Sequence, residues 1–214
     1  MDIPRETLLL MYERMLKIRH FEDRVKDLFA AGEIPGNVHL YLGQEAVAVG
    51  ACAPLNDDDY ITSTHRGHGH IIAKGGDLSL MMAELYGKAT GYNKGKGGSM
   101  HIADPRLGIL GANGIVGAGL PIATGAGLSA KLRKSGQVAV CFFGDGASNQ
   151  GTFHESINIA AAFDLPVVYV CENNLYAVGT RQRDVRKVED IADRGVGYAI
   201  PGLAVDGNDV IAVY

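Results

Sequence analysis

Apolar residues recur at the spacings of helices and strands along most of the chain. From residue 5 to residue 31 they return every three or four positions, as in an amphipathic helix, with Pro4 suited to its first turn and Gly32 to its end. Residues 138–143 and 167–171 form continuous apolar runs, which are typical of strands buried on both faces. The whole pattern predicts helices over residues 5–31, 43–53, 78–86, 120–132 and 152–163, and strands over residues 60–63, 138–143 and 167–171.

The order of these elements predicts an α/β fold with a parallel sheet and helices on both faces. Strand 138–143, helix 152–163 and strand 167–171 follow one another as in a right-handed βαβ unit. A chain of 214 residues, 47% of them hydrophobic, suits a single domain over residues 1–214. Within it we expect residues 1–40 to form a helical N-terminal extension.

Composition excludes several classes of protein. A net charge of −4 does not indicate the excess of basic residues that is typical of proteins binding nucleic acid. No apolar run approaches the ~18 residues of a membrane span, and the acidic, amphipathic N-terminus is unlike a signal peptide. Cys52, Cys141 and Cys171 are few and far apart, which indicates reduced thiols in the cytoplasm. We therefore expect a cytoplasmic protein whose partners include neither nucleic acid nor a membrane.

Glycine is unusually frequent, with 29 residues that gather in the middle of the chain. Such density indicates backbone that approaches something closely. Residues 87–104 are too rich in glycine for regular structure and are expected to form an ordered loop. The longer segment 87–119 also carries the apolar residues Ile109, Leu110, Ile115 and Val116, so we expect it to line a binding site or an interface.

Polar residues follow two predicted strands at the point where each strand ends. Gly144-Asp145-Gly146 follows the first strand, and Asn173-Asn174 follows the next. Ligands of parallel sheets sit beyond these carboxyl ends, and carboxylate and amide oxygens suit Mg²⁺. Gly146, Ala147 and the helix after them offer backbone N–H groups to a phosphate. The alternative is a simple turn and a strand end, which becomes improbable when both motifs occur one βαβ unit apart.

Two other motifs allow more than one interpretation. The segment THRGHGH contains His65, His68 and His70, which would either bind Zn²⁺, form a solvated polar loop, or serve a cofactor site. GAGLSA, residues 125–130, has the spacing of a dinucleotide fingerprint, but no strand precedes it, so its glycines are expected to permit close helix packing. The charged run of residues 181–190 is expected to be solvated and partly mobile.

Together these motifs resemble one known family. Gly144-Asp145-Gly146 and Asn173-Asn174, separated by residues 147–172, resemble the thiamine diphosphate–Mg²⁺ motif. The stretches KGKGGSMHIAD, GANGIVGAGLP, FFGDGASNQGTFHES and CENNLYAVGT are similar to the α subunit of the E1 component of 2-oxo acid dehydrogenase complexes and of acetoin dehydrogenase. The resemblance extends from Met11 to about Asp209. It implies a thiamine diphosphate-binding fold and an oxidoreductase.

The resemblance also assigns roles to individual residues. It implies that Asp145, Asn174 and the main-chain carbonyl of Tyr176 ligate Mg²⁺, and that Gly146 and Ala147 contact the diphosphate.

Further roles follow for three loops. Gly114 and Val116 would present backbone groups to the aminopyrimidine ring, and Arg66 would hold the diphosphate. His68 would face the active-site funnel as a catalytic residue. His65, also a catalytic candidate, stands where pyruvate-specific members commonly have tyrosine.

Partners follow from the same resemblance. It implies an E1 β subunit that supplies the glutamate for the aminopyrimidine, an α2β2 assembly, and transfer of an acyl unit to the lipoyl domain of an E2 acyltransferase. The substrate would be a pyruvate-like 2-oxo acid or acetoin. The sequences THRGHGH and AKGGD are more similar to acetoin dehydrogenase than to pyruvate dehydrogenase. Relatives continue beyond VDGNDVIAVY, so we expect a fragment or a short member, truncated at the C-terminus. A non-catalytic cofactor-binding or assembly module remains the alternative.

Overall fold

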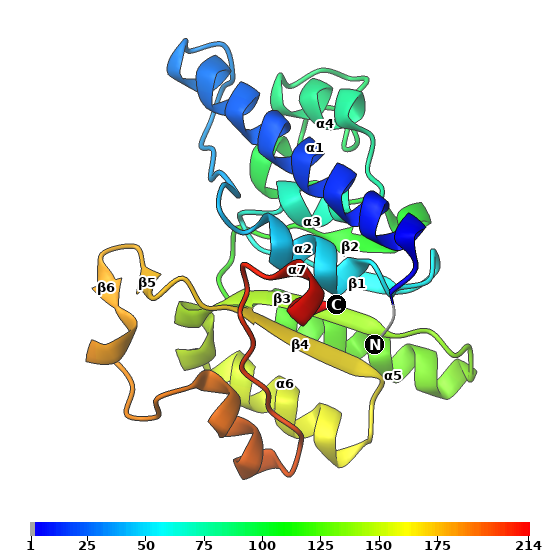
Figure 1. Cartoon of the computed structure of the whole chain (residues 1–214), viewed down its shortest axis with the longest axis vertical. Helices are drawn as coiled ribbons and strands as arrows, with labels where there is room; N and C mark the ends of the chain where they lie inside the picture. The colour runs from blue at the N-terminus through cyan, green and yellow to red at the C-terminus, as the bar shows by residue number, and fades with distance from the viewer. Residues whose placement is uncertain (1–2) are drawn as a thin grey trace.

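The computed structural model describes residues 3–214 and contains a four-stranded parallel sheet between two groups of helices (Figure 1). The α-helices are α1 Arg5–Ala30, α2 Glu45–Cys52, α3 His68–Ala73, α4 Leu78–Leu85, α5 Gly119–Arg133, α6 Gly151–Ala162 and α7 Val210–Val213. The strands are β1 Tyr60–Thr62, β2 Ile109–Gly111, β3 Ala139–Gly144, β4 Val167–Glu172, β5 Tyr176–Ala177 and β6 Thr180–Arg181. Short 3-10 helices are η1 Gly98–Met100, η2 Pro105–Leu107, η3 Asp145–Asn149, η4 Gln182–Asp184 and η5 Ile191–Tyr198.

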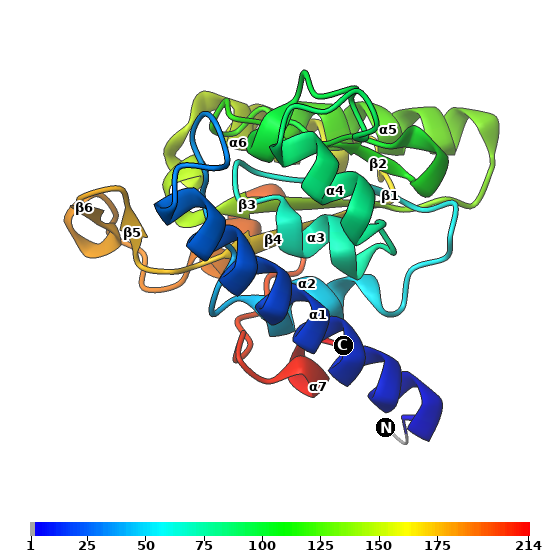
Figure 2. The same cartoon turned by 90° about the horizontal axis from the view of Figure 1, so that it is seen from above.

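The sheet has the strand order β2-β1-β3-β4, and all its pairs are parallel. Helices α5 and α6 cover one face, while α1, α2 and α3 cover the other (Figure 2). The predicted parallel α/β fold is therefore confirmed. Because every strand runs the same way, all four carboxyl ends lie along one edge of the sheet.

Strand β3 is buried on both faces, as its sequence predicts. Val140 and Phe142 belong to the core beneath α1, α2 and α3. Cys141 and Phe143 alternate with them and face the core beneath α5 and α6. Successive side chains of a strand point to opposite faces, so an unbroken apolar run is what this position requires.

Helix α5 explains the glycines of GAGLSA. A Cβ atom added at Gly127 would lie 2.4 Å from Cγ2 of Val167 in β4, so the helix can pack this closely only with glycine there. Nothing lies within 4 Å of the corresponding point at Gly125. Close packing is thus confirmed for Gly127, whereas Gly125 faces open space.

Several elements were not predicted from sequence, and two of them, β2 and α3, bear on the site. Residues 109–111 form strand β2, where Ile109 pairs with Ile61 of β1. The second half of THRGHGH opens helix α3, in which His68 and His70 are both fully buried. The polar-loop alternative is therefore wrong for these two histidines, since the helix directs them into the interior together with Ile71.

The glycine-rich loop of residues 87–98 is ordered around one carboxylate. Glu84, fully buried in α4, accepts hydrogen bonds from backbone N–H groups of the loop. Their N···O distances are 2.8 Å for Asn93, 2.9 Å for Gly95, 2.7 Å for Gly97 and 3.1 Å for Gly98. Burial raises the pKa of Glu84, but these four bonds outweigh it and lower the pKa below its ordinary value.

Helix α1 belongs to the same core as the sheet. Its buried face includes Met11, Ile18 and Val25, which pack in the cluster that also holds Phe142. The helix begins after Pro4 and ends before Gly32, whose φ of +74° suits only glycine comfortably. Of the helices formed by residues 3–214, none combines the length and apolar character needed to cross a membrane.

Strand β4 lies at one edge of the sheet. Within residues 3–214 it pairs with β3 alone, along its whole length. The side chain of Val168 is 52% exposed. One row of β4 backbone groups is therefore left without a partner strand in the described part of the chain.

Candidate functional site

Four loops meet where the parallel strands end. Residues 63–67 follow β1, residues 112–118 follow β2, residues 145–150 follow β3, and residues 173–179 follow β4. Gly144 pairs with Glu172, so Asp145 and Asn173 leave the sheet from neighbouring positions. The arrangement brings residues far apart in sequence to one edge, as expected for ligand sites in such sheets.

Asp145 is a buried carboxylate at the start of η3. It is 3% exposed, and no side chain among residues 3–214 donates a hydrogen bond to its carboxylate. Burial raises the pKa of Asp145, while backbone N–H groups and the charge of Arg186 oppose this rise. Burying an ionised carboxylate costs folding free energy unless a nearby cation compensates its negative charge.

A hairpin formed by β5 and β6 lies against this turn. A Cβ atom added at Gly146 would be 2.6 Å from Cβ of Ala177 in β5, so only glycine allows the hairpin to approach so closely. Between them is a cavity of about 360 Å³, lined by Asp145, Gly146, Asn149, Ala177, Thr180, Gln182 and Val185. The glycine after Asp145 thus has a defined structural role beside an open, partly polar cavity.

Asn174 is held in place from two sides. Its Nδ2 donates to Oε1 of Gln44 at 3.3 Å, and its Oδ1 accepts from the backbone N–H of Tyr176 at 3.3 Å. The oxygens of Asp145, Asn174 and the Tyr176 carbonyl are the hard donors that Mg²⁺ prefers, so this set fits the ion chemically. Gln44, from the loop before α2, was missed because its contact joins segments distant in sequence.

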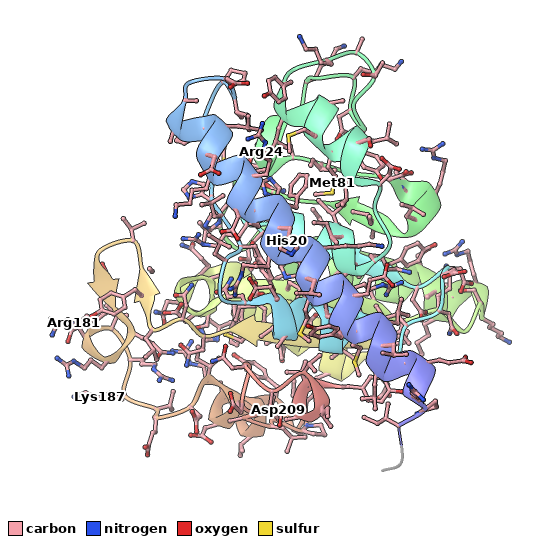
Figure 3. All side chains as sticks on the ribbon, turned by 45° about the horizontal axis from the view of Figure 1, so that its top comes forward. His20, Arg24, Met81, Arg181, Lys187 and Asp209 are labelled. Atoms are coloured by element: carbon pink, nitrogen blue, oxygen red, sulfur yellow. The ribbon has the colours of Figure 1, made fainter. Side chains whose placement is uncertain are left out.

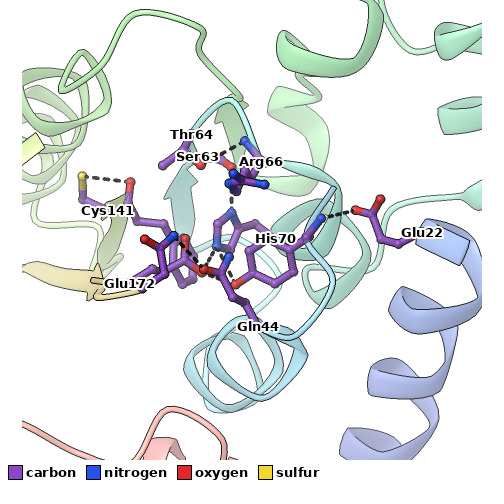
Figure 4. Close-up of polar contacts among 11 residues, drawn as sticks. Glu22, Gln44, Ser63, Thr64, Arg66, His70, Cys141 and Glu172 are labelled. Carbon is purple, nitrogen blue, oxygen red and sulfur yellow. Dashed lines mark hydrogen bonds and ion pairs between the residues drawn. The ribbon is translucent and has the colours of Figure 1, made fainter. Parts of the chain in front are cut away.

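A buried polar network supports the end of β4 (Figure 4). Glu172 accepts a hydrogen bond from the hydroxyl of Tyr41 and lies 3.1 Å from Nε2 of His70. Nδ1 of His70 lies 2.8 Å from Oγ of Ser63, and its ring stacks on Phe142 with centroids 3.8 Å apart. This network fixes the residue directly before Asn173 and links β4 to the loop after β1.

The structure corrects the expected orientation of His68. Its ring is fully buried, with Nδ1 3.0 Å from Oε1 of Glu22 and Nε2 2.9 Å from Oγ of Ser99. His68 therefore does not face an open funnel in this chain. Both of its ring nitrogens are engaged by residues of α1 and η1.

His65 remains near the surface of the site. Its ring meets that of His39 edge to face, with centroids 4.8 Å apart. Burial lowers the pKa of His65, and the neighbouring His39 and Arg66 lower it further, so the ring is neutral at pH 7. His39 was missed by sequence reasoning because nothing local distinguishes it from a surface histidine.

A zinc site of three histidines is not formed. His68 and His70 are engaged separately, by Glu22 and by Glu172, whereas His65 lies against His39. More generally, residues 3–214 contain no group of three or more His, Cys, Asp or Glu side chains placed to hold a metal ion. The ligands expected for Mg²⁺ include only one side chain of these four types, that of Asp145, so they would not form such a group.

The remaining predicted contacts lie at the same edge but outside the cavity of Asp145. Nη1 of Arg66 donates to the carbonyl oxygen of Leu40 at 2.7 Å, and Arg66 does not line that cavity. In the loop after β2, Gly114 and Val116 are exposed, and the N–H of Gly114 approaches Nε2 of His101 at 3.4 Å.

Nearly the whole chain matches one protein family. Residues 13–214 match the family described as the dehydrogenase E1 component. The chain belongs to this family. The resemblance drawn from its motifs is thereby confirmed.

Curated relatives of this E1 chain include subunits with two different names. The α subunit of acetoin:2,6-dichlorophenolindophenol oxidoreductase is 60% identical in Bacillus subtilis and 55% identical in Cupriavidus necator, each over 214 residues. The pyruvate dehydrogenase E1 component α subunit of Zymomonas mobilis is 47% identical over 210 residues. These matches cover 98–100% of this chain but 64%, 64% and 59% of the relatives, so the chain spans less than two thirds of their length.

Proposed function

We propose that this chain is the cofactor-binding part of an E1 α subunit that uses thiamine diphosphate and Mg²⁺. The observation that carries the proposal is that Asp145, Gly146 and Asn174 follow neighbouring strands at one edge of the sheet, where Asp145 and Gly146 line a cavity of about 360 Å³. Family membership supports it, since residues 13–214 match the dehydrogenase E1 component family.

Different residues at this edge of the sheet would bind the metal ion and the diphosphate. Asp145, Asn174 and the carbonyl of Tyr176 would hold Mg²⁺, and the backbone of Gly146 and Ala147 would contact the diphosphate. The bound cofactor would supply a carbanion that attacks a carbonyl group and a ring that then accepts electrons.

Other loops would orient the cofactor and handle protons. The exposed backbone of Gly114 and Val116 would bind the aminopyrimidine ring, and Arg66, with donors beyond the one used by Leu40, would reach the diphosphate from the loop after β1. His65, neutral at pH 7, would be able to accept a proton there. His68 would act by positioning the glycine-rich loop through Ser99 rather than by touching substrate.

We further propose acetoin as the substrate, with a pyruvate-like 2-oxo acid as the second candidate. The two acetoin-named relatives have 60% and 55% identity, against 47% for the pyruvate-named relative. The acyl product would pass to the lipoyl domain of an E2 acyltransferase.

The three cysteines form no disulfide within residues 3–214, which supports a reducing compartment such as the cytoplasm.

A partner β subunit would complete the site, in an α2β2 assembly. Exposed apolar side chains at the carboxyl edge support this: Ile115 is 71% exposed and Val178 fully exposed, with Val116, Leu175 and Tyr176 about half exposed. Apolar groups concentrated beside a binding site are typical of a surface that another chain covers.

The test uses the full-length protein co-expressed with its β subunit. Reduction of 2,6-dichlorophenolindophenol is followed with acetoin or with pyruvate, with and without thiamine diphosphate and Mg²⁺. We expect turnover with acetoin that requires both cofactors. Asp145→Ala should abolish Mg²⁺-dependent cofactor binding, whereas Asp23→Ala, on the exposed side of α1, should leave it intact.

Three results would change the assignment. Unchanged cofactor affinity in Asp145→Ala would refute the metal site. Turnover of pyruvate but not acetoin would move the substrate to the second candidate. Tight cofactor binding without any turnover would favour a non-catalytic binding or assembly module.

A further inference from the structure

The segment after the β5–β6 hairpin is less solvated than its charge pattern predicts. Arg181, the last residue of β6, and Lys187 within the segment do project into solvent (Figure 3). Gln182, between them, is only 5% exposed, and Arg186 is partly buried. The segment therefore turns two of its polar side chains inward, toward the sheet edge.

These two side chains are bonded to each other and leave two donors free. Nη2 of Arg186 donates to Oε1 of Gln182 at 2.7 Å. Nε2 of Gln182 and Nη1 of Arg186 are both buried and have no hydrogen-bond partner in the described part of the chain. Since the amide oxygen of Gln182 is already used, the pair offers only N–H groups. A buried donor without a partner is destabilising and rare in folded proteins, so such a pair points to a missing acceptor.

The position of the pair is next to the proposed cofactor site. Gln182 lines the same cavity as Asp145, and its backbone N–H donates to the carbonyl oxygen of Leu175 at 3.0 Å, which fixes it to the loop after β4. Burial raises the pKa of Asp145 and of Cys171, and the charge of Arg186 opposes the rise in both. The guanidinium therefore lies close to the ends of β3 and β4.

We propose that Gln182 Nε2 and Arg186 Nη1 donate hydrogen bonds to a phosphoryl oxygen of the bound diphosphate. This inference rests on the proposed function and adds to it an anion contact from the segment after the hairpin, besides Arg66. One cationic donor and one neutral donor side by side match a phosphoryl group, which only accepts hydrogen bonds.

The neighbouring carboxylate makes this contact dependent on the metal. An anion placed between Arg186 and Asp145 is attracted by the first and repelled by the second. A divalent cation on Asp145 removes the repulsion, so the pair binds phosphate together with Mg²⁺. The same geometry gives opposite expectations for the two ions, because Arg186 repels a bare cation at Asp145 and attracts an anion.

The experiment measures both ions on the full-length protein in complex with its β subunit. Binding of Mg²⁺ alone, and of inorganic pyrophosphate at a fixed excess of Mg²⁺, is followed by calorimetry in the parent and in Arg186→Met. We expect pyrophosphate affinity to fall about tenfold or more, the range for a lost charge-assisted hydrogen bond. Mg²⁺ affinity should stay equal or increase.

Matched variants separate this contact from loss of structure. Arg183→Met, in the same segment with a side chain 75% exposed, should leave both affinities within about twofold, as expected for a solvated charge. Arg186→Lys should recover part of the pyrophosphate affinity, and Gln182→Leu should weaken it without changing the net charge.

The outcomes distinguish this inference from the proposed function. Pyrophosphate affinity unchanged in Arg186→Met, together with its loss in Asp145→Ala, would overturn the inference and keep the proposed site. Equal loss of Mg²⁺ and pyrophosphate in Arg186→Met would also overturn it, because the residue would then only stabilise the fold. Pyrophosphate and Mg²⁺ binding that Asp145→Ala leaves unchanged would refute the proposed function itself.

Discussion

Replacing Glu84 with glutamine should destabilise the protein by about 2–4 kcal/mol. Oε2 accepts the N–H groups of Asn93 and Gly95, while Oε1 accepts those of Gly97 and Gly98. Glutamine keeps one oxygen and places an NH₂ group where the other stood, so two N–H donors lose their acceptor. Each unmet donor costs roughly 1–3 kcal/mol, reduced where water can enter the loop.

Urea unfolding followed by circular dichroism measures this loss. The control is Glu13→Gln, which removes an exposed pair with Lys17 on α1 and should leave the stability nearly unchanged. The pKa of Glu84 is lowered in the folded state, so its stabilisation is present above the unfolded pKa of about 4.3 and lost as pH falls through the folded value. Glu84→Gln should therefore show a shallower loss of stability in acid. A cost equal to that of Glu13→Gln would refute the argument that this carboxylate orders the loop.

Three further predictions concern packing and thiol chemistry. Gly127→Ala should destabilise the protein by about 1–3 kcal/mol, because the added Cβ would lie 2.4 Å from Val167 of β4. Gly125→Ala, where the added Cβ meets open space, should stabilise it by up to ~1 kcal/mol in the same unfolding assay. Equal effects of the two substitutions would contradict the close packing of α5 at Gly127. His68→Leu should cost roughly 3 kcal/mol, because it leaves the buried Glu22 of α1 with only the backbone N–H of Tyr41 as a partner, and a neutral result would mean that this pair is unimportant. Burial raises the pKa of Cys52 and Cys141 to about 12, so neither thiol should react with Ellman's reagent at pH 7 until the protein is unfolded; rapid reaction in the native state would contradict this.

The sequence predicts those parts of the site that lie at the ends of regular elements. Asp145 and Asn174 follow unbroken apolar runs, so their place at one edge of a parallel sheet follows from periodicity alone. Gln44 and Glu172 were not predicted as supports, because their partners lie 102 to 131 residues away in the chain. Contacts of that kind depend on how complete layers pack, which local patterns do not encode.

The error over His68 has a related cause. The alternation of histidine and glycine in THRGHGH is equally compatible with a polar loop and with a helix whose polar side chains find buried partners. The deciding partner is Glu22, which helical spacing places on the buried face of α1 with Ile18 and Val25, although its acidic side chain alone would suggest the surface. A buried charge on one element therefore decides the orientation of a histidine on another.

The unpaired side of β4 has a consequence for how the polypeptide behaves in solution. Charged side chains and prolines commonly keep strand edges apart, but β4 contains no proline, and its one acidic residue, Glu172, is buried. An extended segment of any chain could continue the hydrogen-bond ladder there, with Val168 adding apolar contact. Two copies meeting edge to edge would build one longer sheet through both molecules. Residues 1–214 produced by themselves should therefore tend to associate as their concentration rises, and any segment that covers this edge should matter as much for solubility as for shape.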